Sequence, residues 1–211
     1  MAASARVQRL LIVILVGLLT AIAVLELTRG GGTSSAPAKP IAKSAFDGPT
    51  MAPGLRAKNF SLTDQNGHHV TLSQYRGKVV VLTFIHSLCH DTCPFMVEQI
   101  KGALNDLPGN GHGIPTIGVS VDPSQDTIAN RRAFLARHEM TGRMEFVNGP
   151  MPTMRRVWHE YAIQPVTPKV DHSAFVLLIN KRGFERVGYA ADQLTPEDLA
   201  HDIRVLERQP A

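Results

Sequence analysis

The sequence predicts an α/β domain in which helices cover both faces of a central mixed sheet. Two observations predict it: apolar runs rich in β-branched residues, as at residues 79–85 and 174–179, and amphipathic stretches between such runs. Runs of this kind are typical of strands buried on both faces, and their alternation with helices predicts a layered α/β sandwich. A chain of 211 residues has room for one such domain plus appendages.

The expected elements follow one another in a simple order. A β-hairpin comes first, because residues 60–62 and 69–72 flank an Asn66-Gly67 turn. Pro94 suits the first turn of a helix, and Thr195 followed by Pro196 is a typical helix start. After the first hairpin we expect a strand at 79–85, a helix from Pro94, a strand at 116–121, a helix at 127–138, a strand at 144–147, a helix at 154–160, a hairpin of strands 174–179 and 184–187, and a last helix ending near Arg208.

Residues 1–27 are expected to form an N-terminal transmembrane helix. Arg6 and Arg9 precede an uncharged, mostly apolar run at 10–25, which as a helix would span about 24 Å of a hydrocarbon core of about 30 Å. Basic residues in front of the run predict a single-pass protein of a bacterial inner membrane, with its domain facing the periplasm or the cell exterior. A cleaved signal peptide is the alternative, because Ala21-Ile22-Ala23 is an acceptable cleavage pattern.

Composition sets the remaining boundaries and excludes some functions. Residues 28–53 are rich in Gly, Ser, Ala and Pro and are expected to be a flexible tether, which leaves 54–211 for the folded domain. Hydrophobic residues make up 44% of the chain, too many for an intrinsically disordered protein. The net charge is only +4 and the basic residues are scattered, so no nucleic-acid partner is expected.

The chain has two cysteines, Cys89 and Cys93, and they directly follow the first buried strand. Two are too few for a disulfide scaffold or a four-cysteine zinc site. They stand at a junction of strand and helix, which is where the thioredoxin fold keeps its redox pair, so we expect a thioredoxin-like sandwich. The N-terminus of the following helix favours the thiolate form that metal binding and disulfide exchange both require.

The spacing of the cysteines allows several kinds of chemistry. When oxidised, Cys89 and Cys93 can close a disulfide, although a ring this small would stabilise the fold by only about 2 kcal/mol. Two thiolates and one imidazole suit copper, as Cu(I) or Cu(II), and zinc would also accept them. The candidate imidazole is His172, because it precedes the strand at 174–179 and would reach the cysteines if that strand is adjacent to the first one.

Three motifs give the chain a resemblance to the Sco/SenC family, which are membrane-tethered copper proteins with a thioredoxin fold. The stretch Gly77-Lys78-Val79-Val80-Val81-Leu82-Thr83-Phe84 precedes Cys-x-x-x-Cys-Pro, Val119-Ser120-Val121-Asp122-Pro123 precedes Asp126-Thr127, and Val170-Asp171-His172-Ser173 is similar to the distal-histidine motif of the family. The likeness runs from Phe60 to the C-terminal helix.

The resemblance implies a copper site made by Cys89, Cys93 and His172, with Asp91 and Asp171 as supporting or docking groups. The implied function is that of a metallochaperone which delivers copper to the copper-A centre of cytochrome c oxidase subunit II, or reduces the cysteines of that centre. A periplasmic copper donor, a thiol reductant and oxidase assembly factors are then the expected partners. The alternative is a membrane-tethered thiol–disulfide oxidoreductase, in which Cys89 attacks and Cys93 resolves.

Two histidines depart from the family pattern. His90 stands where the family usually has proline, and His86 stands where it usually has an aromatic or small residue. Each is open to three interpretations: a fourth metal ligand, a positive charge that lowers the pKa of a cysteine, or an exposed loop residue.

Overall fold

The structure is a computed structural model that describes residues 15, 20, 44–165 and 174–211. It divides into two units, Met1–Lys43 and Ser44–Ala211, and the second is the folded domain. The expected N-terminal transmembrane helix, most of the tether, and Asp171 and His172 lie outside the described residues. Within the described part of the chain, no helix has the length and apolar character needed to cross a membrane.

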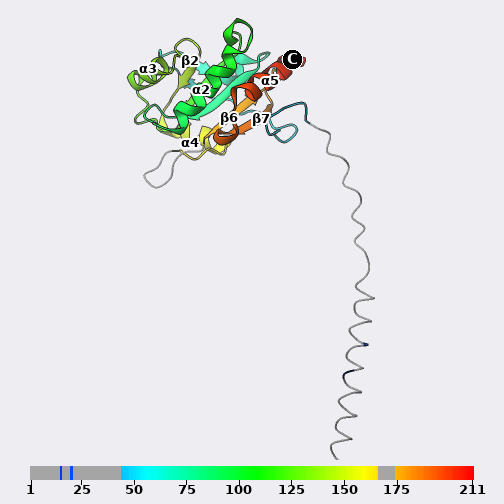
Figure 1. The fold of residues 1–211 in the computed structure, drawn as a ribbon. Coiled ribbons are helices and arrows are strands. Elements are labelled where there is room, and N and C mark those ends of the chain that lie inside the picture. Colours follow the sequence, from blue (N-terminus) through cyan, green and yellow to red (C-terminus); the bar gives the residue numbers. More distant parts are fainter. Residues whose placement is uncertain (1–14, 16–19, 21–43, 166–173) are drawn as a thin grey trace, which may run out of the picture. The chain divides into compact units, whose positions relative to one another are not determined.

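The domain is built on a five-stranded mixed sheet, in the order β5-β4-β3-β6-β7. β6 and β7 lie next to each other in this sheet (Figure 1). β3, β4 and β5 run parallel, whereas β6 pairs antiparallel with both β3 and β7. A separate antiparallel hairpin, β1 and β2, precedes the sheet. The strands are β1 (Ser61–Thr63), β2 (His69–Thr71), β3 (Val80–Ile85), β4 (Thr116–Ser120), β5 (Glu145–Val147), β6 (Phe175–Ile179) and β7 (Glu185–Ala190).

The helices begin and end close to the expected residues. Thr195 accepts a hydrogen bond from the Asp198 backbone N–H and so caps the last helix as its sequence indicates. The helix at 154–160 begins earlier than expected, at Met151, directly after Pro150. The helices are α2 (Thr92–Asn105), α3 (Ile128–Arg137), α4 (Met151–Glu160) and α5 (Pro196–Glu207), with short 3-10 turns at Leu72–Tyr75, Pro108–Gly111 and Ala191–Gln193.

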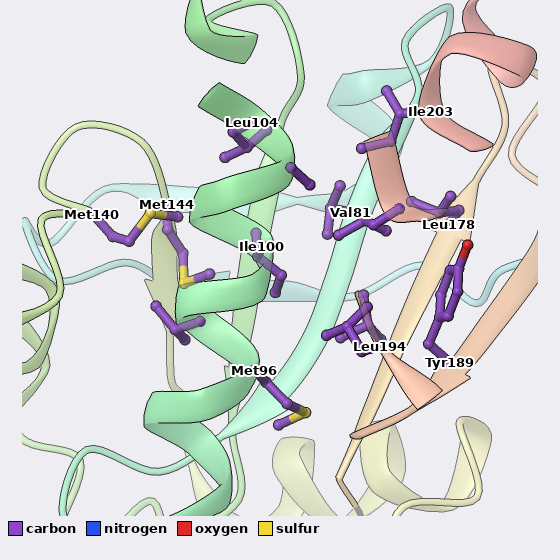
Figure 2. Close-up of a cluster of buried hydrophobic side chains, with 14 of the residues drawn as sticks. Val81, Met96, Ile100, Leu104, Met140, Met144, Leu178, Tyr189, Leu194 and Ile203 are labelled. Atoms are coloured by element: carbon purple, nitrogen blue, oxygen red, sulfur yellow. The ribbon is translucent and has the colours of Figure 1, made fainter. Parts of the chain in front are cut away.

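The alternation of side chains along β3 creates two cores, one on each face of the sheet. Val81 and Ile85 face α2, whose Met96, Ile100 and Leu104 form the apolar stripe seen in Figure 2. Val80, Leu82 and Phe84 of β3 belong to the other core, with the β1–β2 hairpin and α4. The sandwich predicted from the apolar runs is therefore confirmed, and β3 lies at its centre.

The folded domain starts earlier than the sequence indicates, because residues 44–53 pack on it rather than extending the tether. The Met51 backbone N–H donates to Arg186 at 2.9 Å, and the Gly188 N–H donates to Pro49 at 2.9 Å. The segment thus pairs with the edge of β7, and Phe46 is buried. The expected boundary at residue 54 is corrected to Ser44.

Candidate metal centre

The two cysteines lie in and next to the loop that joins β3 to α2. Cys93 is the second residue of α2 and is fully buried, whereas Cys89 lies in the loop and is 8% exposed. Both are thiols in this structure. The central strand therefore delivers both sulfurs to one end of the sheet, and Cys89 is the more exposed of the two.

His86 completes a group of three ligand residues at this end of β3. A ligand nitrogen of His86 and the Sγ atoms of Cys89 and Cys93 all lie within 4.8 Å of one another. His86 is half-buried and directly follows Ile85, the last residue of β3. Soft thiolates and one imidazole are a donor set that suits Cu(I) and Cu(II), and also zinc.

Hydrogen bonds converge on the sulfur of Cys89. The Cys93 backbone N–H, at the start of α2, donates to Cys89 Sγ at 3.3 Å. A hydrogen bond to Cys89 raises the pKa of His86, although partial burial opposes the rise. The pKa of the Cys93 thiol is raised well above its usual range, first by a hydrogen bond to Cys89 and then by burial. Cys93 therefore keeps its proton in this structure.

The buried carboxylate of Asp126 anchors the loop that joins β3 to α2. Asp126 accepts hydrogen bonds from the backbone N–H and hydroxyl of Ser87, at 2.7 and 2.6 Å, and from the Ser120 hydroxyl at 2.5 Å. Burial raises the pKa of this carboxyl, and the hydrogen bonds from Ser120 and Ser87 oppose that rise. From the sequence, Asp126 is identified only as part of a motif, and its role as a hydrogen-bond acceptor is not predicted. The available signal was that Ser87 and Ser120 stand at the ends of two neighbouring strands.

Of the other predicted site residues, the two that the structure describes do not belong to this group. His90 and Asp91 are exposed, and Asp91 makes no side-chain capping bond to α2. The ligand role of His172 and the supporting role of Asp171 stay predictions, since both residues lie outside the described part of the chain. The premise for His172 is confirmed, however, because β6 is adjacent to β3 and pairs Val176 with Thr83.

The beginning of β6 lies beside the end of β3. The Thr83 hydroxyl donates to the Phe175 carbonyl at 2.9 Å, and the described chain resumes at Ala174, two residues after His172. The point where the chain enters β6 is thus at the same end of the strands as the cysteine loop. This placement supports the expectation that a residue shortly before Ala174 can reach the sulfurs.

A Cys-x-x-x-Cys pair at the end of the central strand of this mixed sheet defines a thioredoxin-like protein, with thiols suited to redox chemistry or to a soft metal ion. The chain belongs to the SCO1/SenC family, whose model matches residues 50–207. Among curated proteins, it is 26% identical over 156 residues to Protein sco1 of Schizosaccharomyces pombe, covering 68% of this chain and 58% of that protein. The chain thus spans little more than half the length of this relative.

Solved structures agree with the family assignment. The chain is 27% identical to ScoI of Bradyrhizobium japonicum, which was solved with copper bound; the TM-score is 0.63, covering 72% of this chain and 99% of that one. It is 20% identical to BsSco, a member of the Sco family of cytochrome c oxidase assembly proteins in which a disulfide switch was identified. There the TM-score is 0.63 and the match covers 77% of this chain and 96% of that one. The second likeness shows the fold alone.

Proposed function

We propose that this protein binds copper through Cys89 and Cys93 and delivers it during assembly of cytochrome c oxidase. The observation that carries the proposal is the sulfur pair at the end of β3, with an imidazole ligand atom within 4.8 Å. Soft sulfur donors select Cu(I). The family membership and the copper-bound relative support the choice of copper. The copper-A centre of subunit II is the destination that the family resemblance implies.

His172 belongs to the proposed ligand set because its motif matches that of the family and β6 begins beside the cysteine loop. Copper is the cargo here, so its ligands must hold it firmly and still release it to an acceptor protein. The cysteines must be reduced before copper binds, since a disulfide offers no thiolate. The proposal therefore includes a thiol reductant upstream of metal loading, and an anchored domain that works on the outer side of a membrane.

Competition for Cu(I) tests the binding. The full chain, reduced and anaerobic, is titrated against a chromophoric Cu(I) chelator, and one bound copper per chain is expected. Cys89→Ser or Cys93→Ser should weaken binding by more than the roughly 10- to 100-fold that loss of a supporting group costs a metal site. Met151→Leu is the matched control, because Met151 is an exposed sulfur residue outside the group. Equal affinities for the parent and both serine variants would rule out the site.

Delivery is tested separately. The copper-loaded chain is mixed with a soluble copper-A domain of oxidase subunit II whose cysteines are reduced, and copper is quantified on each protein after separation. Transfer at a rate well above that from a small copper–thiolate complex is expected. A transfer rate no faster than that of the small complex would mean that the protein stores copper and does not deliver it.

A second function, thiol–disulfide exchange, is favoured by the hydrogen bonds that converge on Cys89. In this reaction the Cys89 thiolate attacks a client disulfide and releases one client thiolate. Cys93 then loses its proton and attacks Cys89 Sγ in the mixed disulfide. The second client thiolate leaves and takes up a proton, so the client gains two electrons and the Cys89–Cys93 disulfide forms. Cys93→Ser should accumulate the mixed disulfide with an oxidised copper-A domain, whereas Cys89→Ser should not. No trapped complex with either variant would exclude this function.

A further inference from the structure

We infer that His86 is a copper ligand in this chain, in addition to the distal histidine that the family motif supplies. The inference rests on the proposed copper function and deepens it, because it assigns a nitrogen donor that departs from the family pattern. It predicts a site with two sulfur donors and an imidazole on one short stretch of chain, His86 to Cys93.

The distances within the group suit a shared metal ion. A metal bound to sulfur at about 2.3 Å and to nitrogen at about 2.0 Å places neighbouring donor atoms roughly 3.5 to 4.0 Å apart. The donor atoms of His86, Cys89 and Cys93 lie within 4.8 Å of one another. Adjustments of about 1 Å or less in the donor positions would therefore bring all three onto one ion.

The backbone on both sides of His86 is fixed, so its imidazole is held near the sulfurs. Ile85 before it is fully buried and ends β3, and the Ile85 carbonyl accepts the Val121 N–H at 3.0 Å. Ser87 after it is anchored through its N–H and its hydroxyl to the buried carboxylate of Asp126. A ligand on a rigid element binds metal at a smaller entropic cost than one on an untethered loop.

His86 is also on the accessible side of the sulfur pair. Cys93 is fully buried and Cys89 nearly so, whereas His86 is half-buried at the end of the strand. Of the three donors, the imidazole therefore belongs to the residue with the greatest solvent exposure. Such a ligand can be replaced by one from an acceptor protein, as copper delivery requires.

His90 provides a matched control in the same loop. It is the residue after Cys89, it is exposed, and it is not in the three-residue group. His90→Gln therefore removes an imidazole from the same loop and leaves the three-residue group intact. Ligation requires the nitrogen to lie within reach of both sulfurs, which the structure shows for His86.

Ligand counting on the copper-loaded full chain tests the inference. X-ray absorption of the Cu(I) form and pulsed EPR of the Cu(II) form report the sulfur and imidazole donors. We expect His86→Gln and His172→Gln each to remove one imidazole from the spectra, and the double variant to remove both. His86→Gln should weaken Cu(I) binding at least about tenfold, and His86→Cys, which restores a soft donor, should recover the affinity. His90→Gln should match the parent.

The outcomes separate this inference from the proposed function. If His86→Gln gives the spectra and affinity of the parent while Cys89→Ser abolishes binding, His86 is not a ligand and the copper function stands. If neither cysteine variant affects binding, the proposed function itself fails. If His86→Gln weakens binding but leaves the imidazole count unchanged, or His86→Cys recovers nothing in a folded protein with a parental circular dichroism spectrum, His86 only positions the loop and the inference is wrong.

Discussion

The carboxylate of Asp126 holds Ser87 through both its backbone N–H and its hydroxyl, at 2.7 and 2.6 Å. Ser87 directly follows His86 and precedes Cys89 by two residues. Asp126 comes from the segment between β4 and α3. Its hydrogen bonds to Ser87 therefore join the two loops that follow the neighbouring parallel strands β3 and β4. The bond network therefore links the stability of the fold to the geometry of the site.

The first prediction concerns this link. Asp126→Ala leaves the Ser87 N–H and two buried hydroxyls without their acceptor, so the free energy of unfolding should fall by about 3 kcal/mol, as measured by urea denaturation of the copper-free chain. Copper affinity should also fall, by roughly 10- to 100-fold. Asp106→Ala, at an exposed aspartate, is the control and should change neither quantity by much. Unchanged copper affinity in a destabilised variant would show that the network supports only the fold.

The second prediction concerns acid stability and the turn of the first hairpin. Asp64 Oδ1 accepts the backbone N–H groups of Asn66 and His68, at 2.7 and 2.8 Å. Burial acts to raise the pKa of this carboxyl, but the hydrogen bonds outweigh it and lower the pKa below 3.8. A lowered folded-state pKa means that the ionised form contributes stability above pH 3.8, and that this contribution is lost as the pH falls through the folded-state value.

Urea unfolding of the parent and of Asp64→Asn between pH 6 and pH 2.5 measures this contribution. The variant should be less stable by about 1–2 kcal/mol at pH 6, and the gap should close below pH 3.8 as the parent carboxyl becomes protonated. Asp192→Asn, at an exposed position, should give no such closing gap. A gap that stays constant down to pH 2.5 would mean that the carboxyl titrates alike in the folded and unfolded states.

The sequence predicts those features that depend on local pattern. The apolar run of β3, the Asn66-Gly67 turn and the Thr195 cap each follow from residues close together in the chain, and all three are present in the structure. The start of the domain does not follow from local pattern. Residues 44–53 look like a tether because they lack periodicity, and they are ordered only by pairing with β7, which is more than 130 residues away in sequence.

The same distinction holds at the candidate site. The cysteine pair and its position at a junction of strand and helix are visible in the sequence, and the structure confirms that position. The sequence did not distinguish His86 from His90, since both are loop histidines within three residues of Cys89. The path of the chain after β3 decides which of the two histidines lies near both sulfurs. Asp126 fixes this path by accepting a hydrogen bond from Ser87, which is 39 residues away in the sequence.

The third prediction concerns a close approach in the N-terminal segment. A Cβ atom added to Gly48 would lie 2.3 Å from Tyr189 Cζ, and Tyr189 is almost completely buried. Gly48→Ala must therefore displace the ring or the segment, and we expect a loss of about 1–3 kcal/mol in unfolding free energy. Gly113→Ala is the control, because nothing lies within 4 Å of its added Cβ. Equal stability of the two variants would show that the segment repacks freely.

The fourth prediction concerns the carboxylate that fixes this segment to α5. Asp202 is fully buried and accepts the backbone N–H groups of Asp47 and Gly48, at 2.8 and 3.0 Å, and the hydroxyl of Tyr189 at 2.5 Å. His201 lies 3.0 Å from the same carboxylate. Asp47, His201 and Asp202 place ligand atoms within 4.8 Å of one another, but the oxygens of Asp202 already accept these hydrogen bonds. Asp202 therefore holds the N-terminal segment against the rest of the domain through these hydrogen bonds.

Asp202→Ala removes the acceptor for all of these donors and should release the segment. We expect hydrogen exchange of the amides of residues 46–51 to accelerate at least about tenfold, and the unfolding free energy to fall by about 3 kcal/mol. Asp47→Ala is the matched comparison, because it deletes an exposed side chain and keeps the backbone N–H that Asp202 binds, so it should cost less than about 1 kcal/mol. Exchange at 46–51 as slow in Asp202→Ala as in the parent would show that pairing with β7 alone holds the segment, since those backbone bonds are intact in both proteins.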